Sequence, residues 1–449
     1  MYNNMKGLKR LGHSLKSILP ERTFRFILKV YHNLLALVQE PLSWYALWRV
    51  NRTIARIQRN DRPLRFCFYV VLPSMFHWRR VFELMQKDER FDPFIVVTPR
   101  IGWQVGDMEA TVEKAFASLV SDYGEKYVFK GYHDGIFDNH IVDCDACAMM
   151  NLYSGLADGR FEVFNLALHG VPVFGSNYSY FPGTRHTPEY FGMRSLRFVR
   201  RFFCSNETEL EVFVKYQKLR KWSDRVEISG SPQSDAIKQG HQNKTRKSIL
   251  ISPHHSVIPT VDSGLCLGNF LNYKDLFAEL PRIYPDVDWI LRPHPHLKIN
   301  LIKNVGWTEA QWNDYLGNFL ANPNATYEDD GPYYESFWKS DAIIHDCGSF
   351  LPEYFYTGKP TCYMLASKES KNYQFINWGI ALIDHTYQAY SKDDIMRFIE
   401  DVVINGKDPM EEERQAFARE KIMVNYPHAS QHIVDSIAEL LGRDKKGAS

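Results

Sequence analysis

Apolar runs of strand length alternate with amphipathic helical patterns from about residue 62 onward. The run RFCFYVVL at 65–72 predicts a buried strand, residues 77–87 have helical spacing, and a second apolar run follows at 94–98. A strand, a helix and a strand in this order predict parallel strands joined by a crossover. The same pattern predicts a helix at 107–122 and further strands at 127–129, 146–153, 163–168, 201–204 and 226–228.

A polar segment at 238–247 separates this half from a second half with the same alternation. The pattern therefore predicts an α/β fold with two Rossmann-like doubly wound domains, at 61–240 and 246–428, and a C-terminal helix and tail at 429–449. The elements expected after the linker are strands at 248–252, 288–291, 341–345 and 361–365 and helices at 272–284, 308–321, 350–357, 393–405 and 429–441.

The stretch at 338–365 is the most informative part of the chain, because it predicts a strand, a turn, a helix and a second strand. Gly348 and Ser349 form the turn, and Glu353 falls in the first helical turn. Free N–H groups at the start of a helix suit a phosphate. The alternative is an ordinary βαβ unit in which Gly348 and Ser349 only cap the helix.

Polar groups follow four of the expected strands, three of them in the second half of the chain. Because such turns lie along one edge of a doubly wound sheet, two domains facing across a cleft would bring the turns together. Arg, His, Ser and turn N–H groups, without an acidic cluster, suit an anionic ligand such as a diphosphate bound without metal. The four turns are His169-Gly170, His254-His255-Ser256, Arg292-Pro293-His294 and Asp346-Cys347-Gly348-Ser349.

Composition and charge narrow the function further. The 449 residues are 45% hydrophobic and 14% aromatic, which is enough for a large core, and the net charge of +1 argues against a nucleic-acid binder. Seven scattered cysteines fit reduced thiols, and the pair Cys144 and Cys147 lacks the second pair that a structural zinc site needs. The sequence has no GxxxxGK[ST] motif, which excludes a P-loop, and no GxSxG motif, which argues against an α/β-hydrolase. No GxGxxG motif follows the first strand, which argues against NAD or FAD binding.

Residues 1–60 contain eleven basic and two acidic residues, a net charge of +9. Apolar side chains at helical spacing between 24 and 38, followed by Trp44, Tyr45 and Trp48, predict a basic amphipathic helical extension. This composition favours a helix on an anionic membrane surface; the alternative is an arm packed on the protein itself or on a second subunit. No membrane span or signal peptide is evident, so we expect a cytoplasmic protein on the inner face of the plasma membrane.

The motifs, taken together and in order, resemble those of the CDP-glycerol glycerophosphotransferase family, the teichoic-acid polymerases and their relatives. The resemblance spans about residues 62–440. The matching residues are Asp346, Ser349, Glu353 and Lys359-Pro360 of SDAIIHDCGSFLPEYFYTGKP, HGVPVFG at 169–175, ISGSPQSD at 228–235 and LRPHP at 291–295.

The resemblance implies a GT-B fold and the transfer of glycerol phosphate, or a related polyol phosphate, from a CDP-activated donor. The acceptor would be a hydroxyl of a membrane-linked cell-surface polymer or its primer, and CMP would leave. His169 would match the family's base, and Arg292, His294 and Ser349 the groups that hold the donor pyrophosphate; no metal or cofactor is implied. The candidate site residues are His169 and His294 as catalytic groups and Gly170, Gly230, Ser231, His254, His255, Arg292, Asp346, Gly348, Ser349 and Glu353 as substrate-binding groups.

The chain departs from the family pattern inside the expected cleft, which leaves the transferred group and acceptor open. Val171 and Gln233 replace a Thr and an Arg, Leu168 stands where an aromatic is usual, and His254-His255 stands where the teichoic enzymes have Thr-Trp-Arg. The main alternative is a GT-B glycosyltransferase that uses a nucleotide sugar for surface polysaccharide synthesis. A sugar-nucleotide epimerase and a catalytically silent scaffold are the remaining alternatives.

Overall fold

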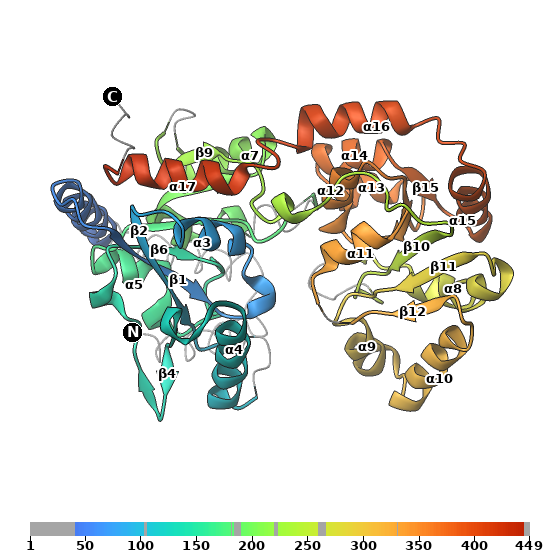
Figure 1. Ribbon diagram of the computed structural model, residues 1–449, viewed down its shortest axis with the longest axis horizontal. Helices are drawn as coiled ribbons and strands as arrows, with labels where there is room; N and C mark the ends of the chain where they lie inside the picture. Colours follow the sequence, from blue (N-terminus) through green and yellow to red (C-terminus); the bar gives the residue numbers. More distant parts are fainter. Residues whose placement is uncertain are drawn as a thin grey trace, which may run out of the picture. The chain divides into compact units, whose positions relative to one another are not determined.

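The computed structural model describes residues 41–102, 106–180, 182–183, 190–219, 223–258, 266–329 and 331–443. Within these ranges the chain forms two compact units (Figure 1). The first comprises the described residues up to Ser176, Met193–Phe202 and those from Val434 onward, and the second comprises the described residues of Asn177–Gly192 and Phe203–Ile433.

The first sheet has seven strands in the order β3-β2-β1-β6-β7-β8-β9. The pairs of β1 with β2 and β6, β2 with β3, and β6 with β7 are parallel. This is the strand order of a doubly wound sheet, in which the order reverses beside the first strand. The strands are β1 (Leu64–Val70), β2 (Phe91–Val97), β3 (Val128–Lys130), β6 (Ala146–Met149), β7 (Val173–Ser176), β8 (Val199–Cys204) and β9 (Val226–Ile228), with a separate hairpin of β4 (Tyr132–His133) and β5 (Ile136–Phe137).

Local signals set the helices of this part of the chain. The Asp107 side chain accepts a hydrogen bond from Glu109 N at 3.0 Å and caps α4, as an N-terminal Asp does. The C-terminal half of α17 is held by Asp435, which pairs with Arg90, and by Ser436, which accepts from Arg201. The helices are α3 (Arg79–Met85), α4 (Met108–Tyr123), α5 (Val163–Leu168), α7 (Glu207–Gln217) and α17 (Ala429–Leu440).

The predicted strand at 163–168 is wrong, because these residues form helix α5. Val163, Leu166 and Ala167 are the buried positions, at helical spacing, and a six-residue apolar run does not distinguish a helix from a strand by length. Gly170, with φ of 84°, ends the helix: its N–H donates to Ala167 O at 2.9 Å, and Val171 N–H donates to Leu166 O at 3.1 Å. His169-Gly170 is therefore a helix stop that precedes β7.

The second sheet has six strands in the order β12-β11-β10-β13-β14-β15, all paired in parallel. Its order is that of the dinucleotide-binding doubly wound fold, with the switch point between β10 and β13. The predicted α/β class with two Rossmann-like units is confirmed. The strands are β10 (Lys247–Ser252), β11 (Val287–Leu291), β12 (Ala325–Tyr327), β13 (Ala342–His345), β14 (Thr361–Met364) and β15 (Tyr387–Ala389).

Strand β10 shows why this sheet is buried on both faces. Ile249 and Ile251 belong to one hydrophobic cluster with Trp289, whereas Leu250 belongs to the cluster on the other face with Tyr363. Helices cover a parallel sheet on both sides, so its strands are apolar throughout. The helices are α8 (Phe270–Ile283), α9 (Leu297–Asn300), α10 (Glu309–Leu320), α11 (Tyr333–Lys339), α12 (Phe350–Tyr354), α13 (Ser370–Gln374), α14 (Asn377–Asp384), α15 (Lys392–Arg397) and α16 (Glu411–Phe417), with the π-helical turns η7 (Leu301–Val305), η9 (Phe398–Ile404) and η10 (Ala418–Ile422) after α9, α15 and α16.

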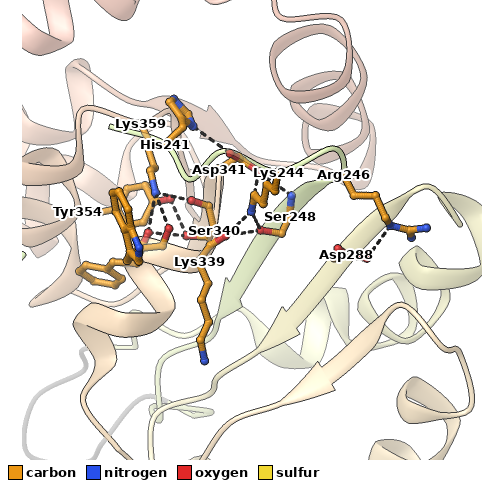
Figure 2. Close-up of polar contacts among 12 residues, drawn as sticks. His241, Lys244, Arg246, Ser248, Asp288, Lys339, Ser340, Asp341, Tyr354 and Lys359 are labelled. Atoms are coloured by element: carbon orange, nitrogen blue, oxygen red, sulfur yellow. Dashed lines mark hydrogen bonds and ion pairs between the residues drawn. The ribbon is translucent and has the colours of Figure 1, made fainter. Parts of the chain in front are cut away.

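Two charged side chains hold the amino edge of this sheet (Figure 2). Asp341 accepts from Ser248 N at 2.8 Å and pairs with His241 and Lys244, at 2.9 Å each, which fixes the segment before β10. Burial alone would raise the pKa of Asp341, but these donors lower it well below its usual value. Buried Lys359 donates to the carbonyls of Phe337, Trp338 and Ser340 at the end of α11, a favourable place for a cation.

Of the predicted basic extension, the structure describes a helix over residues 41–57, while residues 1–40 lie outside the described ranges. Gln58 Nε2 donates to Leu440 O at 3.0 Å, and Arg443 donates to Ile57 O at 3.1 Å, so the helix end is held against the end of α17. Every helix in the described part of the chain is too short or too polar to span a bilayer.

Candidate active site

The switch point of the second sheet gathers three of the four predicted turns. The turns after β10, β11 and β13 all leave the carboxyl edge, where open α/β sheets bind ligands. The register pairs Ser252 of β10 with His345 of β13, so the two strands end side by side. The following turns begin at Pro253 and Asp346 and therefore start next to each other.

Asp346 joins these turns from inside the unit. Its side chain is fully buried, and its two oxygens accept from His254 N at 2.6 Å and Asn269 N at 2.5 Å. Burial raises the pKa of Asp346 to about 7, although the hydrogen bonds from His254 and Asn269 act in the opposite direction. The carboxyl group predicted to contact substrate is thus directed at backbone amides, and it positions the turn that carries His254 and His255.

Four imidazole rings cluster beside the turns that Asp346 joins. The ring centroids of His254 and His255 lie 4.1 Å apart, and those of His255 and His294 lie 4.4 Å apart. His254 and His294 are 5.8 Å apart, and His296 lies 5.5 Å from His294. The structure therefore brings together His254, His255 and His294, which the sequence predicted, and adds His296.

Local hydrogen bonds engage the Nδ1 atom of three of these rings. The Nδ1 atom of His294 accepts from His296 N at 3.1 Å, and that of His254 accepts from Ser256 N at 3.2 Å. Asn300 donates to His255 Nδ1 at 3.2 Å. Because an imidazole whose Nδ1 accepts a hydrogen bond carries its proton on Nε2, each of these rings has an Nε2–H donor.

His294 is uncharged around neutral pH. Burial, together with the neighbouring rings of His255 and His296, lowers the pKa of His294 to about 3. A group of ring N–H donors binds anionic oxygens through hydrogen bonds.

Arg292 lies in the same turn, but its guanidinium is engaged within the unit. It donates to Glu328 at 3.3 Å, Ser336 Oγ at 3.4 Å and Gly331 O at 2.6 Å. Burial alone would raise the pKa of Glu328, but Lys339, Ser336 and Arg292 hold it below its usual value. In this arrangement Arg292 ties the end of β11 to the chain after β12.

The turn before α12 contains the other predicted binding residues. Gly348 and Ser349 are partly exposed, and a Cβ on Gly348 would meet only Leu267 and Pro182, at 3.6 and 3.8 Å. Glu353 is 2% exposed, and burial raises its pKa to about 8. A neutral carboxyl group can donate as well as accept, which suits a ligand hydroxyl.

Gly230 and Ser231 follow β9, where the backbone approaches another segment closely. Gly230 has φ of 81°, and a Cβ there would lie 2.0 Å from Val424 O. The Ser229 hydroxyl donates to Gly230 O at 2.8 Å. The glycine is therefore required by packing within the second unit.

His169, the predicted base, lies at the amino end of β7 and not at the carboxyl edge, because α5 ends there. It is exposed, and its Nδ1 donates to Asn165 O at 2.9 Å. The histidine after β1 is His77, which is buried and receives a hydrogen bond from Ser176 Oγ at 3.0 Å. Burial lowers the pKa of His77 to about 4, so it is a neutral structural group.

A cavity of about 350 Å³ lies at the amino ends of β1 and β6 in the first unit. Two of its arginines are already engaged, since Arg62 pairs with Asp145 at 2.7 Å and Arg443 donates to backbone carbonyls. Among the described residues, Glu109, Glu113 and His133 come within metal-binding reach of one another, but the Lys130 ammonium bonds to Glu113. Neither feature adds to the donor set at the second sheet.

Sequence reasoning missed the groups that orient the imidazoles. Asn269 precedes a helix and Asn300 ends one, and both read as ordinary cap residues. Ser256 accepts from Leu267 N and Gly268 N at 3.0 Å each, which closes the turn after β10. The sequence signal for this turn is the run His254-His255-Ser256, which is one of the four predicted turns.

Comparison with known proteins shows the fold. No protein-family model matches the chain, and no curated protein sequence matches it. A UDP-N-acetylglucosamine 2-epimerase structure has a TM-score of 0.54 at 12% identity and covers 87% of this chain and 99% of its own. The UDP-GlcNAc 2-epimerase from Neisseria meningitidis bound to UDP-GlcNAc has a TM-score of 0.52 at 13% identity, covering 83% and 99%. A variant of the wall teichoic acid polymerase TagF soaked with CDPG has a TM-score of 0.50 at 14% identity, covering 94% and 98%. The fold of this chain is GT-B, as the resemblance implied.

Proposed function

We propose that the chain is a transferase that moves glycerol phosphate, or a related polyol phosphate, from a CDP-activated donor to a hydroxyl of a cell-surface polymer or its primer. The acceptor oxygen forms a bond to the phosphorus next to glycerol, and the bond from that phosphorus to the oxygen of CMP breaks. The hydroxyl proton passes to a base, and CMP leaves. The proposal needs no metal ion or cofactor.

One observation carries the proposal: three imidazoles, each with a proton on Nε2, meet at the switch point of the second sheet. His254, His255 and His294 offer donors to the oxygens of a diphosphate. Phosphoryl transfer is driven mainly by positioning and by stabilisation of charge on the phosphate oxygens, so a donor cluster fits that task. The family resemblance of this region and the similarity in fold to TagF support the choice of donor.

The base is the second element of the proposal. The resemblance implies His169, whose Nδ1 donates to Asn165 O, so that Nε2 is the acceptor for the proton. If His169 is the base, His169→Ala abolishes turnover and leaves donor binding intact. A near-normal rate in that variant would move the base to another group.

The acceptor is proposed to be linked to the membrane, with the protein at the inner face of the plasma membrane. The basic composition of residues 1–60 supports this location. Without the polymer acceptor, the enzyme should release CMP only slowly by hydrolysis.

The alternative is an enzyme that acts on a nucleotide sugar, either a glycosyltransferase of surface polysaccharide synthesis or an epimerase. The similarity in fold to two epimerases supports it, as does the pair His254-His255, which replaces the Thr-Trp-Arg of the teichoic enzymes. In this case UDP or another nucleoside diphosphate would bind to the same imidazoles.

The test is CMP release from CDP-glycerol by the purified protein, with lipid-linked or oligosaccharide acceptors. We expect release that depends on the acceptor. We also expect His255→Ala and His294→Ala to weaken donor binding by about 10- to 100-fold each, the value of a hydrogen bond to a charged group. His133→Ala, at an exposed histidine of the first unit, is the matched control. Reaction with a UDP-sugar and none with CDP-glycerol would establish the alternative.

A further inference from the structure

The chain that continues from strand β7 belongs to the second unit. The described residues of 177–183, here called the post-β7 segment, follow the carboxyl end of β7 and are part of that unit. The backbone holds the segment there, because Ile376 N–H donates to Pro182 O at 2.9 Å. The hydroxyls of Tyr180 and Tyr356, 2.7 Å apart, add a buried side-chain contact. The post-β7 segment is therefore a fixed part of the second unit.

The post-β7 segment borders the turn before α12. A Cβ on Gly348 of that turn would meet Pro182 Cγ at 3.8 Å, and a Cβ on Gly379 would lie 2.6 Å from Pro182 O. The second approach is too close for any side chain, so a glycine is needed where the segment packs. Because the turn of Gly348 follows β13 at the carboxyl edge of the second sheet, the segment lies beside the candidate site at that edge.

Tyr178 is the partly accessible tyrosine of this segment, with 37% of its surface exposed. Burial of the hydroxyl raises the pKa of Tyr178, and the Ser179 hydroxyl acts in the opposite direction. Cys347 and Glu353 also raise this pKa, which places the phenol oxygen near both groups, on either side of Gly348 in the chain. Tyr178 therefore keeps its proton around neutral pH and is a hydrogen-bond donor next to the turn before α12.

Two neighbouring tyrosines have hydroxyls that are engaged within the protein. Tyr180 meets Tyr356, and Tyr363 donates to Asp346 O at 3.1 Å. Tyr180 is 6% exposed and Tyr363 1%. Tyr178 differs from both because solvent reaches it, so a ligand bound at the turn of Gly348 can reach it as well.

We propose that Tyr178 contacts the substrate and donates its phenolic hydrogen to an oxygen of the phosphate farther from the nucleoside. This inference rests on the proposed function, in which that phosphate is the one next to glycerol. As the acceptor oxygen bonds to its phosphorus and CMP leaves, a donor aimed at the phosphate oxygens stabilises their charge. Tyr178 keeps its proton throughout, and the proton of the acceptor hydroxyl passes to a separate base.

The place of Tyr178 in the chain supports this role. Ligand-binding loops of doubly wound sheets leave the carboxyl ends of the strands. Tyr178 follows the carboxyl end of β7, whereas His169 precedes the strand and lies at its amino end. The post-β7 segment is thus the part of the chain after β7 that reaches the turn of Gly348.

The experiment is calorimetric titration of the full-length protein and of Tyr178→Phe with CDP and with CMP. The second phosphate of CDP stands for the phosphate next to glycerol, and CMP lacks it. We expect Tyr178→Phe to bind CDP about 10- to 100-fold more weakly, the value of a hydrogen bond to a charged group, and to bind CMP within about twofold of the parent protein. In the release assay, kcat with CDP-glycerol should fall about 100-fold, the effect of losing one donor to a developing charge.

The matched control is Tyr373→Phe, which removes a hydroxyl from an exposed position on α13 of the second unit, and circular dichroism checks that each variant is folded. Equal affinity of Tyr178→Phe and the parent protein for CDP would overturn the inference. An equal loss of affinity for CMP would also overturn it, because Tyr178 would then hold the nucleoside part.

The same titrations with UDP and UMP separate this inference from the choice of donor. If the parent protein binds UDP and not CDP, a selective loss of UDP affinity in Tyr178→Phe supports the contact with the phosphate, while the proposed function moves to a nucleotide sugar. If the parent protein binds none of the four nucleotides, the inference and the proposed function both fail.

Discussion

Replacing Asp346 tests whether its buried carboxyl group holds the turns of the candidate site together. Asp346→Ala removes the carboxylate oxygens that accept from two backbone amides, those of His254 and Asn269. A buried unsatisfied amide costs about 1–3 kcal/mol, so the variant should lose about 2–6 kcal/mol in the free energy of unfolding of the second unit. Asp346→Asn keeps one acceptor and should lose about half as much.

The assay is urea unfolding at pH 8, followed by hydrogen exchange of the amides of β10 and β13, which reports the second unit separately. Asp286→Ala, at an exposed carboxylate, is the control and should stay within about 0.5 kcal/mol of the parent protein. Because the turn of His254 and His255 loses its anchor, donor affinity should fall together with stability. If Asp346→Ala lowers the free energy of unfolding by less than about 1 kcal/mol, Asp346 does not hold these turns together.

Three further predictions concern single side chains. Gly230→Ala should lower the free energy of unfolding by more than about 3 kcal/mol, because φ is positive at this residue and the new Cβ meets Val424 O. Gly348→Ala should fold normally and lose donor affinity. Thermal unfolding and titration with the donor distinguish the two effects. Lys359→Met should cost about 3–5 kcal/mol, as measured by urea unfolding, because it removes the donor to two buried carbonyls and one partly buried carbonyl at the end of α11. Burial raises the pKa of Glu353 to about 8, so between about pH 4.5 and 8 the folded state holds the proton that the unfolded state has lost. The parent protein therefore loses stability as the pH rises through this window, and Glu353→Gln should gain stability relative to it by up to about 1.4 kcal/mol per pH unit. The measurement is urea unfolding at several pH values, and equal pH dependence of the free energy of unfolding in the two proteins would contradict the prediction.

The sequence predicted most of the fold because strands in a buried parallel sheet are apolar throughout and end in recognisable turns. The runs at 65–72 and 248–252 appear as β1 and β10 within two residues at each end. The predicted strand at 163–168 was wrong because six mostly apolar residues fit either a helix or a strand. A glycine such as Gly170, which here ends helix α5, can also follow a strand. Short edge strands such as β12 and β15 gave no apolar run to detect.

The candidate site was predicted in part for a related reason. Position along the sheet edge follows from the strand order, so the proximity of His254, His255 and His294 could be expected. The direction in which each side chain points could not, because it depends on partners distant in sequence. Arg292 meets Glu328, 36 residues away, and Asp346 meets Asn269, 77 residues away.

These partners change what the family-like signature means. Asp346, Lys359, Arg292 and Gly230 carry much of the resemblance, yet in the structure each one is engaged with backbone or with an internal ion pair. Such residues specify the shape of the sheet edge. Under the proposed function, the choice among nucleotide-linked donors therefore depends on groups that the signature does not contain. The pair His254-His255 is the clearest of these, because it lies at the switch point and departs from the family pattern, so exchanging it should alter donor preference before it alters the fold.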